Sequence, residues 1–227
     1  MNKSGSNARY RLTAAWRLRS LRSLRLNARF VRASPSRNPL VGILGKGLPT
    51  VASRPVRIVN YDANWAIAFR ELSSVLSDHL GELALRIEHV GSTSVPGLPA
   101  KPIIDMTIVI LNRSYLPKVI EVLSELGYHH RGDIGVRDRE AFGCDNVNVP
   151  YTDPKKSWPS HHLYCCHEES MPLVCHVQFR DYLQVHAEDA YQYSELKRKL
   201  AAQYGSDREG YTNAKTGFIE SIMERIS

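Results

Sequence analysis

The sequence predicts an α/β (α+β) domain in which a small mixed β-sheet carries helices packed on one side. Apolar side chains recur at helical spacing over residues 64–80, 116–126, 187–204 and 207–226, which predicts four amphipathic helices. Residues 103–111 are mostly apolar and β-branched, which is typical of a strand buried on both faces. Short segments with strand composition lie between the helices, and no internal repeat is found.

The first half of the predicted domain is expected to alternate strands and helices. Residues 56–60 are predicted to be a short edge strand or an extended lead-in. Either Asp62 or Asn64 can cap the helix that follows, because both side chains accept hydrogen bonds from first-turn N–H groups. Gly127 is expected to end the second helix, since glycine readily adopts the left-handed conformation that closes many helices.

The second half is expected to contain short antiparallel strands followed by two helices. Gly, Asn and Pro residues separate four segments with strand composition. The two C-terminal helices have ordinary apolar stripes, which indicate core packing and no particular function. The expected strands are residues 127–131, 139–146, 161–167 and 173–180.

Charge divides the chain into two parts. The formal net charge is +7, yet residues 1–57 contain 13 Lys and Arg and no acidic residue. The rest of the chain contains 17 basic and 23 acidic residues, so a folded domain of residues 56–227 is mildly acidic. The high isoelectric point is therefore no evidence for a nucleic-acid-binding domain, and no specific nucleic-acid partner is expected.

Residues 1–55 are predicted to be a basic extension with a Pro- and Gly-rich linker, outside the fold. Three interpretations stay open: an organelle transit peptide, a tail that touches a membrane or nucleic acid, and upstream sequence that is not truly translated. Four cysteines, two of them adjacent, suggest no disulfide framework, and no apolar run approaches the ~20 residues that span a bilayer. We expect a cytoplasmic protein, or a mitochondrial one if the presequence is genuine.

A strand–loop–strand segment, residues 87–109, carries the most informative chemical pattern. Its Gly-, Ser- and Pro-rich loop can bring N–H groups and hydroxyls close to an anion, as phosphate-binding loops do. Asp105 follows on the next strand, and this layout is typical of nucleotidyltransferase sites, where the loop holds a triphosphate and carboxylates hold Mg²⁺. The alternative is an ordinary Gly/Pro connection. The candidate phosphate-binding residues of the loop are Gly91, Ser92, Thr93 and Ser94.

A family resemblance rests on this segment. The run from His89 to Leu98, HVGSTSVPGL, and the following AKPIID of residues 100–105 resemble the signature of the GrpB family, as do Leu196-Lys197 and Lys215-x-x-Phe218-Ile219. The resemblance implies a nucleotidyltransferase-like fold, because this largely uncharacterised family is grouped with that superfamily. Related domains can occur joined to dephospho-coenzyme A kinase, which implies an accessory role in coenzyme A metabolism. The chain has no Walker loop, so it is not expected to be that kinase.

The carboxylates that two-metal nucleotidyl transfer needs are incomplete in the sequence. Such sites usually have Asp-x-Asp or Asp-x-Glu on one strand, so that both carboxylates project from the same face. Here Asp105 is followed by Thr107, which is a neutral and weak ligand. One hypothesis is a single divalent ion held by Asp105 and His162, with Mg²⁺ or Mn²⁺ favoured and Zn²⁺ less so. The other is a degenerate nucleotide pocket without a metal.

Four further side chains are candidates, each with a structural alternative. His89 could act as a general base beside the loop or could pin the loop through a hydrogen bond. Strand alternation places His162 on the open face of the sheet if Leu163 faces the core. Lys101 could neutralise a phosphate or lie solvated in the loop. Arg180 could clamp a phosphate through its planar guanidinium or pair with a carboxylate.

These residues predict one of two kinds of protein. The first is an enzyme that binds a nucleoside triphosphate and transfers a nucleotidyl or phosphoryl group to a small acceptor, which the sequence does not identify. The second is a non-catalytic nucleotide- or phosphate-binding module, which the missing second carboxylate favours. In the enzyme, Asp105, His162 and His89 would be catalytic, and Lys101 and Arg180 would contact phosphate together with the loop.

Overall fold

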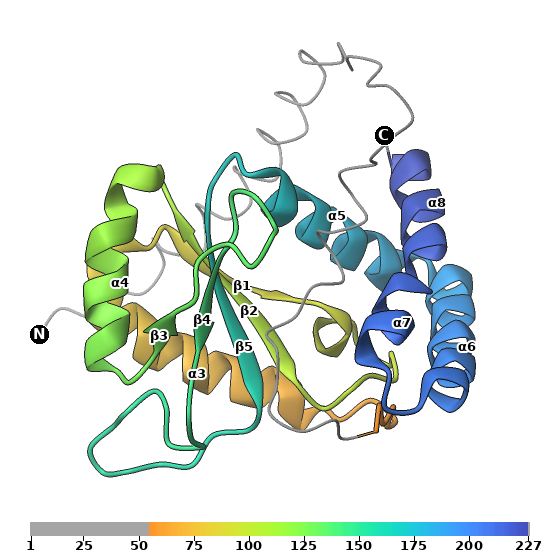
Figure 1. Cartoon of the computed structure of the whole chain (residues 1–227), viewed down its shortest axis with the longest axis horizontal. Helices are drawn as coiled ribbons and strands as arrows, with labels where there is room; N and C mark the ends of the chain where they lie inside the picture. The colour runs from red at the N-terminus through yellow and green to blue at the C-terminus, as the bar shows by residue number, and fades with distance from the viewer. Residues whose placement is uncertain (1–54, 227) are drawn as a thin grey trace, which may run out of the picture. The chain divides into compact units, whose positions relative to one another are not determined.

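The fold is built on a mixed five-stranded β-sheet (Figure 1). The structure is a computed structural model that describes residues 55–226. The strands lie in the order β1-β2-β5-β4-β3, with β2 and β5 parallel and the other neighbouring pairs antiparallel. This confirms the predicted α+β class with a small mixed sheet. The strands are β1 (Arg86–Val90), β2 (Ile104–Ile110), β3 (His129–His130), β4 (Glu140–Gly143) and β5 (His161–His167).

Six α-helices accompany the sheet in the part of the chain that the structure describes. The first begins where the sequence predicts, because the N–H of Asn64 donates to Oδ1 of Asp62 at 2.9 Å. The predicted extension of residues 1–55, with its presequence alternative, lies outside the described residues apart from Pro55. The helices are α3 (Asn64–Leu80), α4 (Leu116–Glu125), α5 (Met171–Val185), α6 (Ala187–Tyr204), α7 (Arg208–Asn213) and α8 (Thr216–Ile226), and the 3-10 turns are η1 (Gly81–Leu83), η2 (Ser92–Ser94) and η3 (Arg113–Tyr115).

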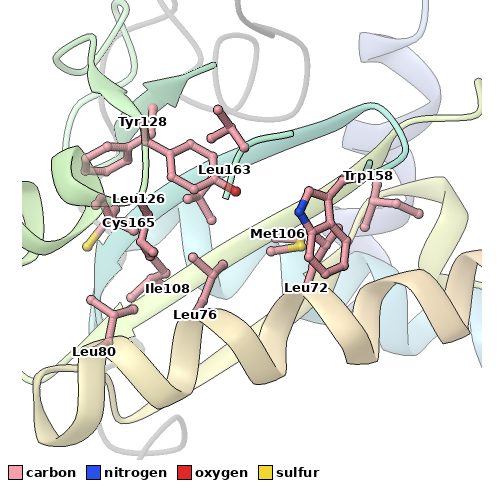
Figure 2. Packing of buried hydrophobic residues seen from close by; sticks show 14 of the residues in the cluster. Leu72, Leu76, Leu80, Met106, Ile108, Leu126, Tyr128, Trp158, Leu163 and Cys165 are labelled. Atoms are coloured by element: carbon pink, nitrogen blue, oxygen red, sulfur yellow. The ribbon is translucent and has the colours of Figure 1, made fainter. Parts of the chain in front are cut away.

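The main hydrophobic core lies between α3, α4 and one face of the sheet (Figure 2). Alternate residues of β2, beginning with Ile104 and ending with Ile110, point into this core. Leu72 and Leu76 of α3 pack against them and are fully buried. Burial of each such side chain contributes ~1.5–3 kcal/mol. This layer therefore holds β2 and β5 in fixed positions for the residues that they present on the other face.

The opposite face of the sheet is covered by α5, and α6, α7 and α8 continue the helical layer beyond it (Figure 1). Val109 of β2 and Cys166 of β5 pack against Leu173 of α5. Helices thus lie on both faces, whereas the sequence analysis placed them on one. Asp105 and His162 belong to this second face, so the side chains singled out from the sequence lie under α5 and not in the main core.

The strand predicted for residues 173–180 is wrong, because this segment lies within α5. Leu173, His176, Phe179 and Leu183 are buried at spacings of three and four residues, which is the helical period. Within an eight-residue window this pattern is easily mistaken for the alternation of a short strand. The expected strand ended at Arg180, whereas α5 continues to Val185. Over this longer segment the helical period is distinct from the alternation of a strand.

Two other elements differ from the sequence expectation. The edge strand expected at residues 56–60 is reduced to one bridge, between Val59 and Ala100. The helix expected over residues 207–226 is broken at Lys215, which lies between α7 and α8. This break matters for function, because Lys215 lines the cavity in which the candidate site lies.

Candidate functional site

A cavity of about 660 Å³ lies between the loop that follows β1, the α5 face of the sheet and helices α5 to α8. Its volume is within the range of pockets that hold small molecules such as nucleotides. Both the predicted loop and the predicted strand residues contribute to its wall. The charged and polar residues that line it include Gly91, Ser92, Thr93, Lys101, Asp105, Arg139, His162, His176, Arg180, Lys197, Arg208 and Lys215.

The loop after β1 is held in place by its own side chains. Ser94 Oγ donates to the carbonyl of Gly91 at 2.5 Å, and Thr93 Oγ1 donates to the carbonyl of Ile103 at 3.3 Å. The Ser92 side chain is hydrogen-bonded to Tyr193 of α6. In contrast, the backbone N–H groups of Ser92 and Thr93 have no backbone acceptor among residues 55–226. These two amides are therefore the donors of the loop that are not already used by the backbone, whereas its hydroxyls are engaged within the protein.

Gly91 allows the loop to lie directly against Asp105. Its backbone has φ 71° and ψ −173°, a combination that is essentially restricted to glycine. A Cβ on residue 91 would lie 2.5 Å from Oδ2 of Asp105. The glycine is therefore required both by the turn and by the close approach of the carboxylate.

Asp105 and His162 face each other across the parallel pair β2–β5. They are register partners, and His162 Nδ1 lies 2.9 Å from Oδ1 of Asp105. Burial by itself would raise the pKa of Asp105, but the hydrogen bond and charge of His162 and the charge of His176 outweigh it and leave the pKa below its usual value. Asp105 is thus ionised at neutral pH, and His162 Nδ1–H donates to it. The other ring nitrogen, Nε2, is left for a second partner.

Three lysines form a second charged group in the cavity, which we call the lysine group: Lys101, Lys197 and Lys215. Each ammonium lies over a tyrosine ring. Lys101 and Lys215 are 4.4 and 4.5 Å from the centroid of Tyr211, and Lys197 is 4.6 Å from that of Tyr193. Within residues 55–226, none of the three forms an ion pair with a carboxylate, although the charge of Asp105 acts on Lys101 and Lys215.

Burial lowers the pKa of every lysine in this group. It lowers the pKa of Lys197 to about 6, and Lys215 and Arg198 lower it further. The pKa of Lys215 falls to about 8 through burial and the charge of Lys101. Lys197 Nζ also donates to the carbonyl of Pro99, so its position is fixed. At neutral pH, Lys215 therefore keeps a poorly compensated charge, whereas Lys197 is mostly uncharged in the absence of a ligand. An anionic ligand would offset the charge and would favour protonation of Lys197.

Sequence reasoning identified Lys101 but assigned no role to Lys197 or Lys215. A lysine within an amphipathic helix normally indicates a solvated surface, yet Lys197 is only 2% exposed. A signal was nevertheless present, because Leu196-Lys197 and Lys215-x-x-Phe218 belong to the GrpB-like pattern. Arg139, which also lines the cavity, is similarly buried and lies 4.4 Å from the centroid of the Tyr164 ring.

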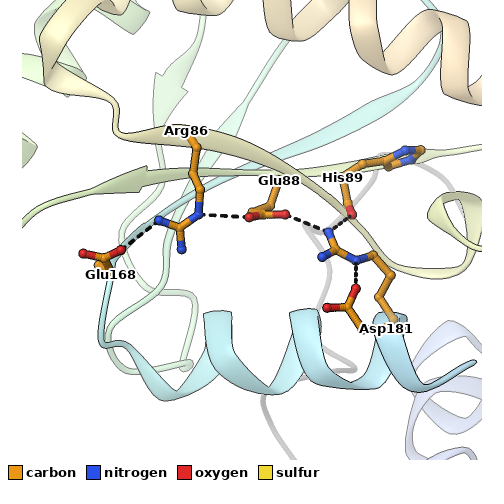
Figure 3. Close-up of polar contacts among 6 residues, drawn as sticks. Arg86, Glu88, His89, Glu168 and Asp181 are labelled. Carbon is orange, nitrogen blue, oxygen red and sulfur yellow. Dashed lines mark hydrogen bonds and ion pairs between the residues drawn. The ribbon is translucent and has the colours of Figure 1, made fainter. Parts of the chain in front are cut away.

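Arg180 borders the cavity but is engaged by protein groups (Figure 3). Its guanidinium donates to Glu88 at 2.7 Å, to Asp181 at 2.8 Å and to the carbonyl of His89 at 2.9 Å. Arg86 contacts the same Glu88 at 3.0 Å. This geometry agrees with the ion-pair alternative and leaves Arg180 poorly placed to clamp a phosphate. The network joins α5 to β1 directly beside the loop.

His89 lies on the other face of β1 and does not line the cavity. Its ring stacks on Phe69 of α3, with 4.5 Å between the ring centroids, and its Nε2 lies 3.0 Å from Thr93 Oγ1. Burial lowers the pKa of His89 to about 4, so the ring is neutral at physiological pH. These contacts correspond to the pinning alternative, because His89 holds the loop through Thr93 and packs against α3.

The residues around Asp105 do not fit the divalent-metal site that the sequence led us to consider. No group of three or more His, Cys, Asp and Glu side chains that could hold a metal ion occurs in the described part of the chain. Thr107 is fully buried on the same face as Asp105, and its Oγ1 has no hydrogen-bond partner among these residues. The nearby acid Glu88 is engaged by two arginines. Asp105 and His162 therefore contact each other, and no third side chain among the described residues completes a metal site with them.

The fold and the site together define an α+β domain with a cationic cavity beside a Gly-Ser loop, and the comparisons assign it to a family. The profile of the family "GrpB protein" matches residues 55–225, so the chain belongs to the GrpB family. The "Glutamate-rich protein GrpB" of Alkalihalophilus pseudofirmus is 30% identical over 172 residues, which cover 75% of this chain and 95% of that protein. The crystal structure of GrpB from Enterococcus faecalis has a TM-score of 0.63 and 28% identity, and the match covers 74% of this chain and 96% of that one.

More distant similarities extend to larger proteins. A dephospho-CoA kinase of Mycolicibacterium paratuberculosis is 24% identical over 194 residues, which cover 77% of this chain but only 47% of that protein. Cid1 poly(U) polymerase aligns with a TM-score of 0.45 at 12% identity, a similarity that carries no argument about activity. None of the helices within residues 55–226 is long and apolar enough to cross a membrane.

Proposed function

We propose that this GrpB domain binds a nucleotide, or a similar small molecule, through its phosphate groups in the cavity beside Gly91–Ser94. The observation that carries the proposal is the lysine group. Three lysines that form no ion pair with a carboxylate within residues 55–226 line a cavity whose wall also includes Ser92 and Thr93, and the N–H groups of these two residues have no backbone acceptor in that range. Bringing like charges together in a buried place is unfavourable, and a bound anion would offset that cost.

Direct binding measurements on the full-length chain test this proposal. Calorimetric titration or thermal shift with nucleotides and coenzyme A precursors, with and without EDTA, would identify the ligand by its stabilisation of the folded state. Coenzyme A precursors belong in the screen because of the similarity to dephospho-CoA kinase. Lys197→Met should weaken binding by roughly 10- to 100-fold, since a charge-assisted hydrogen bond contributes ~1.5–3 kcal/mol.

The matched control is Lys199→Met, two positions along the same helix. Lys199 is exposed and does not line the cavity, so this variant loses the same charge without touching the site. Equal affinities of the two variants would contradict the assignment of the cavity. The absence of binding to every phosphate compound would contradict the proposed function as a whole.

A second candidate function, phosphoryl or nucleotidyl transfer, is favoured by the contact between Asp105 and His162. A carboxylate that fixes one ring nitrogen of a histidine leaves the other as a general base, here for an acceptor hydroxyl in the cavity. The test is turnover of each ligand that binds. Transfer activity that is lost in His162→Gln and strongly reduced in Asp105→Asn, while binding persists, would support an enzyme. Binding without turnover in the wild-type protein would support the non-catalytic module.

A further inference from the structure

We infer that the cavity takes a di- or triphosphate group free of a divalent cation, with Lys101 and Lys215 supplying the positive charge that a metal ion would otherwise supply and Lys197 adding a further N–H donor. This inference rests on the proposed function, because it specifies which form of a phosphate ligand the same cavity binds. It departs from the nucleotidyltransferase-like pattern, in which carboxylates hold Mg²⁺ against the phosphates.

The first argument concerns the acidic residues. A divalent metal that bridges protein and phosphate needs carboxylates that face the cavity. Asp105 is the one acid on the sheet that lines it, and its Oδ1 is engaged by His162 at 2.9 Å. The next outward position of β2 is Thr107, which contributes no charge. Glu209 of α7 also lines the cavity, but it belongs to no group of three or more potential metal ligands among the described residues. A metal ion beside Asp105 would therefore have one shared carboxylate of the sheet and several lysines in the same cavity.

Glu88 does not supply the missing second carboxylate, although it is the register partner of Thr107 on β1. Its two carboxylate oxygens are divided between Arg86 and Arg180, at 3.0 and 2.7 Å (Figure 3). Burial raises the pKa of Glu88, but the two arginines lower it by more, so the acid is ionised and already neutralised by protein groups. Glu88 also does not line the cavity. Recruiting it to a metal would break the network that joins α5 to β1.

The second argument concerns the arrangement of the lysines. Lys101 and Lys215 both lie close to the ring of Tyr211, at 4.4 and 4.5 Å from its centroid, which places two ammonium groups in one part of the cavity. Lys197 approaches from α6 and is fixed by the carbonyl of Pro99. The three lysines come from the loop before β2, from α6 and from the connection between α7 and α8, so a ligand that contacts all of them has to reach across the cavity. A chain of two or three phosphates can satisfy all of them.

Charge complementarity gives a definite expectation for magnesium. Chelation of Mg²⁺ cancels part of the negative charge of a triphosphate and occupies the oxygens that the lysines would contact. Bound Mg²⁺ would also lie close to uncompensated lysines, which is unfavourable. The metal-free anion is therefore the better partner for this cavity, and binding should become weaker as salt rises.

The test is a calorimetric titration of the full-length protein with orthophosphate, pyrophosphate, inorganic triphosphate and ATP, each in EDTA and in excess Mg²⁺. We expect affinity to rise from orthophosphate to triphosphate, and triphosphate and ATP to bind in EDTA at least as tightly as in Mg²⁺. Lys215→Met should weaken triphosphate by roughly tenfold or more and remove most of the difference between triphosphate and orthophosphate. Lys199→Met is the control and should bind like the wild-type protein.

Each of the other outcomes overturns a distinct statement. Triphosphate or ATP binding that requires Mg²⁺ would overturn the inference while leaving the proposed function intact. Orthophosphate binding as tight as that of triphosphate would overturn the assignment of a phosphate chain. If none of these anions nor any nucleotide binds in either condition, the proposed function itself fails. Circular dichroism of Lys215→Met would separate loss of binding from loss of folding, and Lys101→Met provides a second variant at the same ring.

Discussion

Replacement of Gly91 by alanine should destabilise the domain by far more than an ordinary loop substitution. Residue 91 has φ 71° and ψ −173°, and a non-glycine residue in such a conformation costs ~1–3 kcal/mol. The new Cβ would also lie 2.5 Å from Oδ2 and 3.1 Å from Cβ of Asp105. Because that Cβ belongs to a buried strand and moves little, the contact should add ~1–3 kcal/mol of overpacking. We therefore expect a total loss of about 2–6 kcal/mol.

The assay is equilibrium unfolding in urea with a parallel thermal melt. For a domain of this size each kcal/mol shifts the Tm by roughly 2–4 °C, so Gly91→Ala should lower it by about 4–24 °C. Gly97→Ala is the matched control in the same loop. Residue 97 also has positive φ, at 78°, but no atom lies within 4 Å of the added Cβ. Its cost should be that of the backbone alone, ~1–2 kcal/mol.

A double-mutant cycle then isolates the contact with the carboxylate. Asp105→Ala removes Oδ2 and Cγ, so the cost of Gly91→Ala should be smaller by about 1–2 kcal/mol in that background. Equal losses for Gly91→Ala and Gly97→Ala, or a coupling energy near zero, would refute the claim that Gly91 is required by the approach of Asp105.

Three further predictions address the second face of the sheet. Thr107→Val should raise stability by about 1 kcal/mol in urea unfolding, because it removes a buried hydroxyl that has no partner among the described residues; a loss of stability would show that the hydroxyl is bonded. Arg180→Met should cost about 2–4 kcal/mol, because it leaves the buried Glu88 with one arginine and frees α5 from β1; a loss below about 1 kcal/mol would contradict a structural role. Burial lowers the pKa of Lys197 to about 6 from its ordinary value of 10.5, so the unfolded chain holds a proton that the folded chain has released. The free energy of unfolding should therefore rise as pH increases from about 6 toward 10.5 and fall as pH decreases. Lys197→Met should reduce this pH dependence, measured by urea unfolding at pH 7 and pH 9. An unchanged pH dependence would contradict the buried position of Lys197.

Local patterns in the sequence sufficed for much of the fold. The apolar stripe of residues 64–80 and the β-branched run of residues 103–111 predicted α3 and β2, because burial of one helix face or of a whole strand leaves a periodic signature. The segment of residues 173–180 was misassigned, because eight residues are too few to separate a period of 3.6 from one of 2 when polar and apolar residues are mixed.

The candidate site was predicted in part. Gly91, Ser92, Thr93, Lys101, Asp105 and His162 were identified from the sequence and line one cavity in the structure. Ser94, which was predicted with them, does not line it and instead donates to the carbonyl of Gly91. The same sequence reasoning also proposed His89 and Arg180, which the structure engages in contacts that hold the loop and α5. The residue type determines which chemistry a side chain can perform. Whether its polar groups are available to a ligand depends on the contacts that it makes within the folded protein.

The sequence by itself determined the α+β class, the Gly-Ser loop with its acidic strand, and the family, because these depend on contiguous residues whose spacing is set by the backbone. Only the tertiary structure decided that Lys197 of α6 and Lys215 between α7 and α8 meet Lys101 beside the loop. These lysines are separated from Lys101 by roughly a hundred residues of chain, and the periodicity of the sequence near each lysine does not indicate that they line one cavity. The packing of α6 to α8 beyond the sheet buries their charges in one cavity, and that burial indicates an anionic ligand.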